Sequence, residues 1–549
     1  MTGSLPVNSS TDAPLDVIVV GAGVGGLYTL YKLRELGFKV HALEQGSGVG
    51  GTWFWNRYPG CRCDVESYQY SYSFSEELQR EWTWSERFAP QPEILKYLNH
   101  VADKFDLRKD ISFNTTVHAA VWDEGKRLWT LACADGTKWT ARFCIMATGS
   151  LSVPRTQVLP KQDQFKGEVY YTAMWPHEGV DVSGKRVGVV GTSASGTQSI
   201  PHFAQQAEHV TVFQRTANFS VPSRNAPMDP AVDADWKAHY PDLRKKQWQT
   251  RSAIIFEDPT KAALECSDVE LEQIFEQRWE AGGLGFLRAF TDLFTDQRAN
   301  DLAADFVRRK IAETVKDPVL ADKLSPRDHP IGSRRICTDP GYYDTFNRDN
   351  VTLVDVREDP VEEMTADGVR TRSGAFYPLD VLVLATGFDA VMGALTRIDI
   401  IGTDGRLLRD QWRNGPEAHL GIAIAGFPNL FYQTGPLSTG TLASMIQGNE
   451  IQTDWLADLL IYARDHKIDR VESTPDKDKE WADECDRIAS PFVHYRAPES
   501  SYIFVAPDGT RRYMVYMGGF DVYGQKLKDC AAQGYEGFVL EHARETAGA

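Results

Sequence analysis

Short apolar runs alternate along the chain with glycine-rich turns and with longer stretches whose apolar residues lie three or four positions apart. Residues 16–20 are an apolar run that leads directly into GAGVGG, and residues 27–36 then show the helical spacing. Another apolar run follows at residues 39–44. This order predicts a strand, a tight turn, a helix and a second strand, which together form a βαβ unit.

The same order recurs in the second quarter of the chain. Residues 185–191 are an apolar run that ends in glycine, residues 193–207 have a helical pattern, and residues 209–215 are again apolar. The chain is therefore predicted to contain two βαβ units of similar size, and so two nucleotide-binding folds.

Between about residues 228 and 330 the pattern changes to long polar and aromatic helical stretches, such as residues 268–281 and 299–315. Strand patterns return later, so the second unit should resume near Arg335 and the first near Gly387. The expected fold class is α/β, with two Rossmann-like dinucleotide-binding domains and a helical insertion in the second. The first domain is assigned to residues 1–151 and 387–549, the second to residues 152–226 and 333–386, and the insertion to residues 227–332.

Composition excludes several classes of partner. The 549 residues are too many for one compact core, and 42% hydrophobic and 25% charged residues are ordinary for a globular protein. A formal net charge of −17, without a concentrated Lys or Arg run, argues against nucleic acid or an anionic membrane. The N-terminus lacks a targeting signal and no apolar run could span a bilayer, so we expect a cytoplasmic protein. The eight Cys lack metal-ligand spacing, so we expect reduced thiols and no metal site.

The first glycine turn has the residues that a dinucleotide pyrophosphate requires. Gly21 makes the tight turn, Gly23 lets the backbone approach the pyrophosphate, and Gly26 permits close packing of the helix. The helix N-terminus adds amide donors and a positive dipole. Glu44 ends the next strand, where a carboxylate accepts hydrogen bonds from a ribose diol. Glycine turns without ligands are common, but here strand, helix and distant acid agree on dinucleotide binding.

The second turn reads GTSASG, in which Ser193 occupies the position of the usual middle glycine. A serine side chain there slightly crowds a pyrophosphate. The second strand of this unit ends in Arg215 rather than in an acid, and a guanidinium suits the 2′-phosphate of NADP through bidentate contacts. NADP is therefore favoured over NAD, although a solvated charge at a strand end is the alternative interpretation of Arg215. The candidate residues of this site are Gly191, Thr192, Ser193, Ser195, Gly196, Arg215 and Thr216.

Two ATG turns, at residues 147–149 and 385–387, each follow an apolar run. Small residues there let the chain pass close to a bound nucleotide. Alone they are ordinary strand-to-loop turns, but beside two βαβ units they indicate a flavoprotein with two nucleotide sites. Thr386 and Gly387 are candidate cofactor residues of the second turn.

The segment GGTWFWNRYPGCRCDVES, residues 50–67, resembles the type I Baeyer-Villiger monooxygenases, a family of class B flavoprotein monooxygenases, almost residue for residue. PIGSRRICTDPGYYDTFNRDNVTLVDV, residues 330–356, is similar to another segment of that family, and the resemblance runs from about Asp16 to Phe431. It implies FAD in the first domain, NADPH in the second, and O2 and a small apolar ketone as substrates. The cofactor residues that it adds are Gly51, Thr52, Trp53, Asp64 and Tyr70.

The resemblance also implies catalytic roles. In the family, ketones become esters or lactones through a flavin peroxide that must stay deprotonated, and Arg335 matches the arginine that favours this anion. Asp64 matches the aspartate that would hold this arginine in place. Arg334 lies where the family commonly has lysine and would add positive charge at the NADP phosphate. The alternative for Arg335 is a structural ion pair without a part in catalysis.

The chain departs from the family fingerprint FxGxxxHxxxW. Phe165, Gly167 and Trp175 fit it, but Tyr171 replaces the histidine that is thought to hold the linker between the two domains. A tyrosine retains one hydrogen-bond donor for that purpose. His177 is displaced by six residues and does not simply substitute.

A second departure lies near the C-terminus. YMVYMGGFDVYG, residues 513–524, stands where the family has a Trp-containing loop that folds over the substrate and the NADP ribose. Tyr513, Met514 and Tyr516 are candidates for a differently shaped pocket wall, with core packing as the alternative.

Three further functions compete with ketone oxidation. A flavin monooxygenase that oxidises nitrogen or sulfur would not need Arg335. A disulfide reductase would need a redox-active CxxC, whereas Cys61 and Cys63 form only CxC. A degenerate FAD-binding protein would have no physical reason to keep Arg334, Arg335 and Asp64 together.

Overall fold

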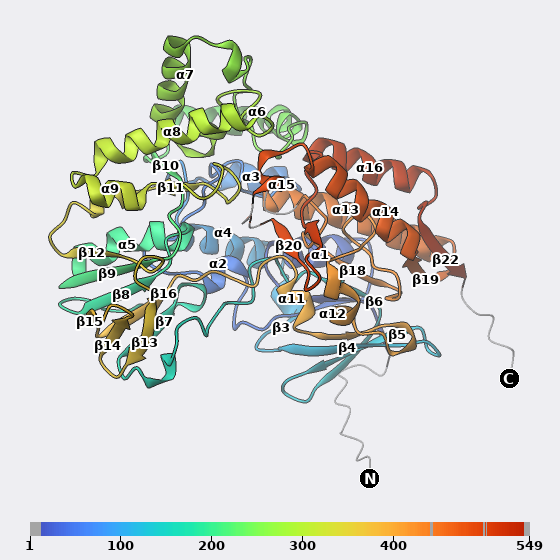
Figure 1. Cartoon of the computed structure of the whole chain (residues 1–549). Coiled ribbons are helices and arrows are strands. Elements are labelled where there is room, and N and C mark those ends of the chain that lie inside the picture. Colours follow the sequence, from blue (N-terminus) through green and yellow to red (C-terminus); the bar gives the residue numbers. More distant parts are fainter. Residues whose placement is uncertain (1–12, 440–442, 498–499, 501, 543–549) are drawn as a thin grey trace, which may run out of the picture.

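Two sheets with helices beside them organise the computed structural model of the chain, which describes residues 13–439, 443–497, 500 and 502–542. The eight-stranded sheet lies at the right of Figure 1, the five-stranded sheet at the left, and a layer of helices above them. No helix among these residues is long and apolar enough to cross a membrane.

The first βαβ unit lies toward one edge of the eight-stranded sheet, where β3 is the edge strand. Strand β1 (Leu15–Val20) pairs in parallel with β2 (Val40–Leu43) and β6 (Lys138–Met146), and α1 (Val24–Glu35) connects β1 to β2. Val17, Ile18 and Val19 are fully buried, as an apolar run covered on both faces requires. The remaining strands are β3 (Ile111–Ser112), β4 (Val117–Asp123), β5 (Leu128–Cys133), β17 (Asp399–Ile401) and β18 (Leu430–Tyr432).

The second βαβ unit forms the centre of the five-stranded sheet, in which every pairing is parallel. Strand β8 (Arg186–Val190) leads into α5 (Ala194–Gln206), which connects it to β9 (His209–Gln214). The strand order is β12-β9-β8-β16-β7, so β12 lies directly beside β9. The other strands are β7 (Glu168–Tyr171), β12 (Val351–Asp355) and β16 (Val381–Leu384).

Two antiparallel chain segments join the sheets. Pro154, on the way out of the first sheet, forms an isolated bridge with Phe388 on the way back. The Arg155 amide donates to the Gly387 carbonyl at 3.1 Å, and the Val391 amide donates to the Ser150 carbonyl at 3.0 Å. Both ATG turns therefore lie where the chain passes between its two lobes.

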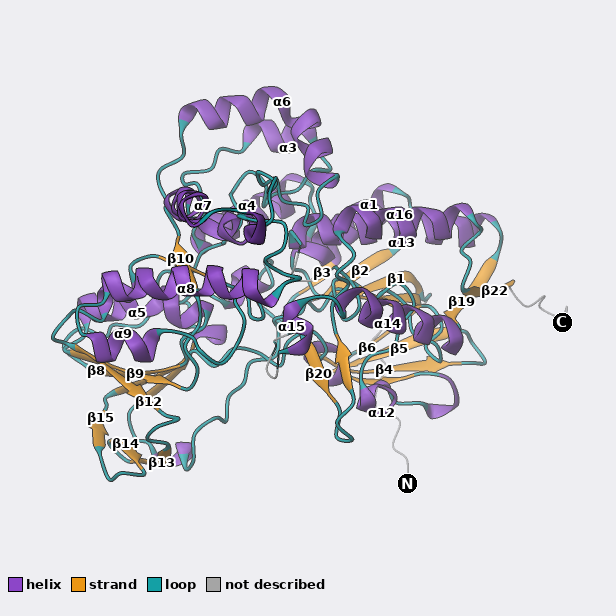
Figure 2. Cartoon of the chain, turned by 45° about the horizontal axis from the view of Figure 1, so that its top comes forward, coloured by secondary structure: helices purple, strands orange, loops and turns teal. Residues whose placement is uncertain are grey.

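The helical layer contains α6 (Pro230–Trp248), α7 (Asp268–Ala281), α8 (Gln297–Thr314) and α9 (Pro318–Leu324). Figure 2 shows α8 and α9 beside the strands of the five-stranded sheet, with α6 and α7 above them. A short parallel pair, β10 (Ser220–Pro222) with β11 (Cys337–Asp339), connects the two ends of the helical layer to the second lobe. The eight-stranded sheet is mixed, since β5 pairs antiparallel with β4 and β6. The predicted α/β fold, with two Rossmann-like domains and a helical insertion, is confirmed.

The other elements complete the two lobes, and α13 packs along α1. They are α2 (Thr52–Trp55), α3 (Glu76–Glu81), α4 (Gln91–Lys104), α10 (Tyr342–Thr345), β13 (Val361–Thr365), β14 (Gly368–Thr371), β15 (Phe376–Pro378), α11 (Gly393–Thr396), α12 (Leu408–Gln411), α13 (Met445–Asp465), β19 (Ile468–Ser473), α14 (Pro475–Ala489), α15 (Val493–Arg496), β20 (Ile503–Val505), β21 (Arg511–Tyr513), α16 (Phe520–Ala532) and β22 (Phe538–His542).

A buried carboxylate links two segments of the first lobe that are distant in the sequence. Glu450 of α13 is 1% exposed and accepts hydrogen bonds from the Ser73 amide at 2.6 Å and the Ser73 hydroxyl at 2.7 Å. Burial raises the pKa of Glu450 from 4.5 to about 7, although these hydrogen bonds and the charge of buried Arg244 oppose the rise. Between these pH values the native state keeps a proton that the unfolded chain has lost, so its stability falls as pH rises.

We expect Glu450→Gln to melt a few degrees above the parent protein at pH 8, since it removes a penalty of at most roughly 3 kcal/mol. The difference should vanish near pH 4.5, where the parent carboxyl is protonated. Thermal unfolding of the FAD-loaded protein at both pH values measures it. An equal difference at both pH values would show that titration of Glu450 is not the cause.

Candidate functional site

The first glycine turn is closed by the first ATG turn. Gly21 has φ +111°, and a Cβ there would lie 2.5 Å from the Ala147 carbonyl oxygen. A Cβ at Gly26 would lie 1.9 Å from the Gly21 carbonyl oxygen. Both contacts are with backbone, so neither can be relieved by a side-chain movement. The turn therefore requires glycine at both positions.

The second glycine turn repeats this geometry. Gly191 has φ +108°, and a Cβ there would lie 2.4 Å from the Ala385 carbonyl oxygen of the second ATG turn. A Cβ at Gly196 would lie 2.2 Å from the Gly191 carbonyl oxygen. The two turns have the same construction, one at the helix N-terminus in each sheet.

The loop of residues 50–67, the segment that resembles the family, passes over the first glycine turn. A Cβ at Gly51 would lie 2.9 Å from the Gly23 Cα, and the Gly50 amide donates to the Ala22 carbonyl at 3.0 Å. The α1 N-terminus has no side-chain cap, so its amides face a cradle made of backbone alone. Such a cradle fits the pyrophosphate of FAD, because both the amides and the helix dipole favour an anion.

Glu44 lies at the end of β2, beside this cradle. Its carboxylate accepts hydrogen bonds from the Ala22 and Gly46 amides, each at 2.7 Å. Burial raises the pKa of Glu44, and the two amides partly oppose the rise. Each carboxylate oxygen still has a lone pair, so the group retains the capacity to accept from a ribose diol.

In the second turn, Ser193 is exposed at the α5 N-terminus and makes no capping hydrogen bond. The Thr192 hydroxyl instead donates to the Thr216 carbonyl at 2.9 Å, which ties the turn to the end of β9. The Thr172 hydroxyl donates to the Ser195 hydroxyl at 3.2 Å. The Ser193 side chain is therefore free to turn away from a pyrophosphate.

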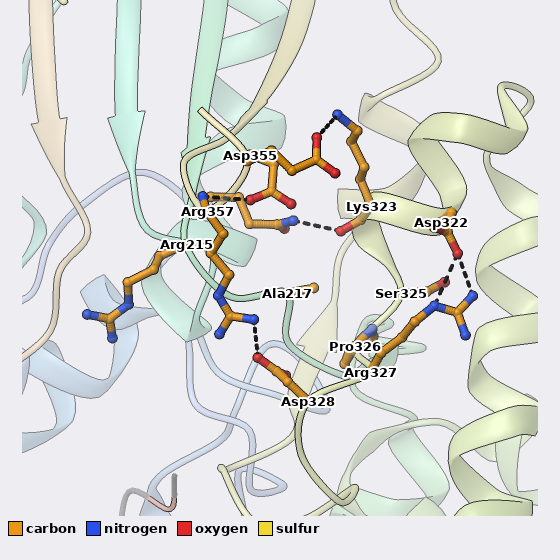
Figure 3. A pocket seen from close by; sticks show the side chains of 12 residues that line it. Arg215, Ala217, Asp322, Lys323, Ser325, Pro326, Arg327, Asp328, Asp355 and Arg357 are labelled. Carbon is orange, nitrogen blue, oxygen red and sulfur yellow. Dashed lines mark hydrogen bonds and ion pairs between the residues drawn. The ribbon is translucent and has the colours of Figure 1, made fainter. Parts of the chain in front are cut away.

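A hollow of about 170 Å³ lies where β9 and β12 end; Figure 3 shows the side chains that line it. Arg215 and Arg357 lie on its strand side, and the end of α9 with the residues after it, up to Asp328, closes the opposite side. Arg215 is exposed and has no hydrogen bond or ion pair within the part of the chain that the structure describes. Its guanidinium is therefore available to an anionic ligand.

Asp64 and Arg335 come together from different lobes. Arg335 Nε donates to Asp64 Oδ2 at 2.6 Å and its Nη2 donates to Oδ1 at 2.7 Å, which is a bidentate pair. Burial alone would lower the pKa of Arg335, but the charge and hydrogen bonds of Asp64 raise it above its ordinary value. The guanidinium is thus permanently charged and fixed in orientation, with about a third of its side chain exposed.

The residues around this pair are aromatic. The Trp53 indole N–H donates to the Tyr70 hydroxyl at 3.1 Å, and the charges of Asp64 and Arg335 both influence the pKa of Tyr70, which burial raises. The same two charges act on buried Tyr502, whose pKa burial also raises. Tyr502 was not among the predicted site residues, because nothing in its local sequence separates it from a core tyrosine.

A second hollow, of about 160 Å³, adjoins Asp64 and lies between residues 64–69 and the helical layer. Its walls include the apolar side chains of Ile254, Ile255, Phe256 and Leu284. Charged side chains, among them Glu66, Arg87 and Arg278, complete the lining. An apolar patch beside charged groups can hold a molecule that is mostly hydrocarbon with one polar group.

Helix α5 of the second lobe packs against the loop that carries Asp64. The Tyr58 hydroxyl donates to Gln198 Oε1 at 2.8 Å, and Gln198 Nε2 donates to the Arg62 carbonyl at 3.2 Å. Cys61 and Cys63 in the same loop are buried and free, and burial raises the pKa of Cys61 to about 12. Buried thiols of this kind do not suit disulfide exchange.

Comparisons with known proteins place the chain. A family model described as pyridine nucleotide-disulphide oxidoreductase matches residues 18–257. A Baeyer-Villiger monooxygenase of Pseudooceanicola batsensis is 40% identical over 539 residues, which cover 97% of this chain and 97% of that protein. The chain belongs to the Baeyer-Villiger monooxygenase family. The predicted family and the predicted class of enzyme, a monooxygenase, are thereby confirmed.

Other relatives widen the chemistry. A phenazine N-monooxygenase of Lysobacter antibioticus is 40% identical over 530 residues, which cover 96% of this chain and 97% of that protein. A solved structure described as OTEMO in complex with FAD and NADP is 40% identical, with a TM-score of 0.93, and covers 96% of this chain and 100% of that one.

The first departure from the family fingerprint, Tyr171 in place of histidine, lies in the linker between the two lobes. Tyr171 lies at the end of β7, where its hydroxyl is 3.4 Å from the Thr156 carbonyl, a weak hydrogen bond. Gln162 Nε2 donates to the same carbonyl at 2.8 Å and so provides the stronger hold on the linker. His177 packs edge-on against Phe54, which lies in the segment of residues 50–67, with ring centroids 4.8 Å apart.

The C-terminal candidates lie in packed surroundings. Tyr513 is 1% exposed, with Tyr502 among its ring neighbours, and Tyr516 stacks on Trp481 at a centroid distance of 5.0 Å. Neither of the two hollows is lined by Tyr513, Met514 or Tyr516. These contacts match the core-packing alternative, and Tyr502 is the aromatic residue of this region beside Arg335.

Proposed function

We propose that the protein binds FAD at the first glycine turn and NADPH at the second, and converts apolar ketones with O2 to esters or lactones. The observation that carries this proposal is the bidentate Asp64–Arg335 pair, whose Asp64 lines a hollow with an apolar patch. Family membership supports both cofactors, and the backbone cradle at Gly23 and Gly51 supports FAD in the first lobe.

Bound FAD would supply the activation of O2, and the chain's own residues would prepare the place of reaction. Arg335 would favour negative charge that develops on oxygen beside the substrate carbonyl, because its guanidinium cannot lose its proton. Asp64 would fix the direction of that charge. Ile254, Ile255 and Phe256 would exclude water and take the hydrocarbon part of the ketone.

Nitrogen oxidation is a second candidate, because the phenazine N-monooxygenase is as similar as the Baeyer-Villiger relative. A soft nucleophile attacks oxygen directly and gains nothing from a neighbouring cation that stabilises an oxygen anion. The two candidates therefore differ in how strongly they depend on Arg335.

The proposal is tested with purified FAD-loaded protein, NADPH and isotopically labelled O2. The substrates are linear, cyclic and aryl ketones, a phenazine and a thioether, with products identified by mass spectrometry. We expect an ester or lactone that carries one labelled oxygen, together with consumption of NADPH. If N-oxide or sulfoxide were formed and no ester or lactone, the second candidate would be established. Yellow protein that NADPH does not bleach without oxygen would indicate a degenerate flavoprotein.

A further inference from the structure

The hollow at the ends of β9 and β12 lies where open parallel sheets bind ligands, at the carboxyl ends of neighbouring strands. It follows the second glycine turn, and its strand side carries both Arg215 and Arg357. Arg357 comes two residues after the end of β12. It lies 141 positions beyond Thr216 in the sequence. The parallel pairing of β12 with β9 brings these residues together.

Two of the cations around this hollow are occupied at its rim. Lys323 pairs with Glu358 at 2.6 Å, and Arg327 forms an ion pair with Asp322. The Arg327–Asp322 pair and the Glu358 side chain are largely exposed, so these ion pairs contribute little beyond holding the rim. Arg215 has no such partner in the part of the chain that the structure covers.

Arg357 differs from these residues because it makes two kinds of contact at once. Its Nη2 donates to the Thr216 hydroxyl at 2.6 Å, and its Nη1 forms an ion pair with Asp328. Burial would raise the pKa of Asp328, but hydrogen bonds from His329 and Arg357 outweigh it and lower that pKa. Asp328 therefore holds Arg357 close to Thr216, which lies just after β9. The Arg357 side chain is still 44% exposed.

We propose that Arg357 adds a guanidinium for the 2′-phosphate of NADPH, beside Arg215 and in addition to the charge expected from Arg334, and so helps to select NADPH over NADH. This inference rests on the proposed function for the identity of the ligand. A phosphate carries close to two negative charges and three acceptor oxygens, which one guanidinium does not satisfy. Arg215 offers the first guanidinium, and Arg357 reaches the same segment through Thr216. Asp328 holds Arg357 in this position until the phosphate arrives.

The test uses two nucleotide fragments as probes, 2′,5′-ADP and 5′-AMP, titrated calorimetrically into the FAD-loaded protein. We expect Arg357→Ala to weaken 2′,5′-ADP about tenfold, the value of one charge-assisted hydrogen bond, and to leave 5′-AMP within about twofold. Arg357→Lys should recover part of the loss, since it keeps the charge without the planar fork. KM for NADPH should rise about tenfold in Arg357→Ala, with kcat unchanged.

Arg327→Ala is the matched control, because it removes the same charge from the same hollow while its partner Asp322 lies on the rim. It should change neither affinity by more than about twofold, as expected for an exposed pair. Equal weakening of both fragments by Arg357→Ala, or no weakening of either, would overturn the inference. Fragment binding needs no oxygenation, so a failure of the proposed function would appear separately, as missing product with an intact preference for 2′,5′-ADP.

Discussion

Arg335→Ala is expected to lose ester formation by about 10²–10³-fold while NADPH still bleaches the flavin at nearly the parent rate. The reason is that the bidentate pair with Asp64 fixes a permanent charge where negative charge develops on oxygen during carbonyl chemistry. Hydride transfer from NADPH develops no such charge. Stopped-flow absorbance without oxygen measures the bleaching, and mass spectrometry with oxygen measures the ester.

Two milder variants separate charge from orientation. Arg335→Lys keeps the charge but loses the fork that engages both oxygens of Asp64, so an intermediate ester rate is expected. Asp64→Asn keeps the shape but releases the guanidinium, and it should also give an intermediate rate. If Arg335→Ala left the ester yield unchanged, Arg335 would be a structural ion pair. If it slowed bleaching and ester formation equally, its role would lie in NADPH binding.

The βαβ units were predictable because their signals are local. The apolar runs that became β1 and β8, and the glycines that open α1 and α5, lie within about 30 residues of one another in each unit. The ATG turns were also visible as small residues after apolar runs. That the carbonyls of Ala147 and Ala385 occupy the space of a Cβ at Gly21 and Gly191 needed the folded backbone.

Contacts between distant segments were not predictable from pattern alone. Asp64 and Arg335 are 271 residues apart, and they were paired beforehand only through the family resemblance. Strand β7, whose sequence EVYY has neither clear alternation nor a fully apolar run, forms because β16, some 210 residues later, gives it a parallel partner.

The two residues that the sequence did not single out illustrate the same limit. Arg357 has the local pattern of a solvated charge in a polar turn, and only the adjacency of β12 and β9 brings it to Thr216. Tyr502 differs from the neighbouring Tyr513 only in its tertiary surroundings, since both are buried and Tyr502 alone is influenced by Arg335. Charge and aromaticity therefore acquire a functional meaning here through strand order and lobe contact.

The repeated geometry of the two glycine turns gives the second large effect, which is a selective loss of one nucleotide at a time. Gly26→Ala is expected to yield a protein that no longer retains FAD, because the added Cβ would meet the Gly21 carbonyl oxygen 1.9 Å away and push α1 from β1. Gly196→Ala places its Cβ 2.2 Å from the Gly191 carbonyl oxygen, so the protein should stay yellow but resist bleaching by NADPH.

The two substitutions are chemically identical and lie at equivalent positions, so each controls for the other. Gly448→Ala in α13 serves as a third variant, because its Cβ would lie 3.5 Å from the Thr434 methyl and 3.7 Å from the Thr439 hydroxyl oxygen, which are ordinary contacts. It should retain FAD and bleach normally. Flavin content by absorbance, and NADPH affinity by the concentration dependence of bleaching, distinguish the cases by at least about fivefold, since overpacking against backbone costs roughly 1–3 kcal/mol or more. If Gly196→Ala lost FAD and Gly26→Ala kept it, the assignment of the two nucleotides to the two sheets would have to be reversed, because the steric conflict at each turn reaches only the ligand of its own helix N-terminus.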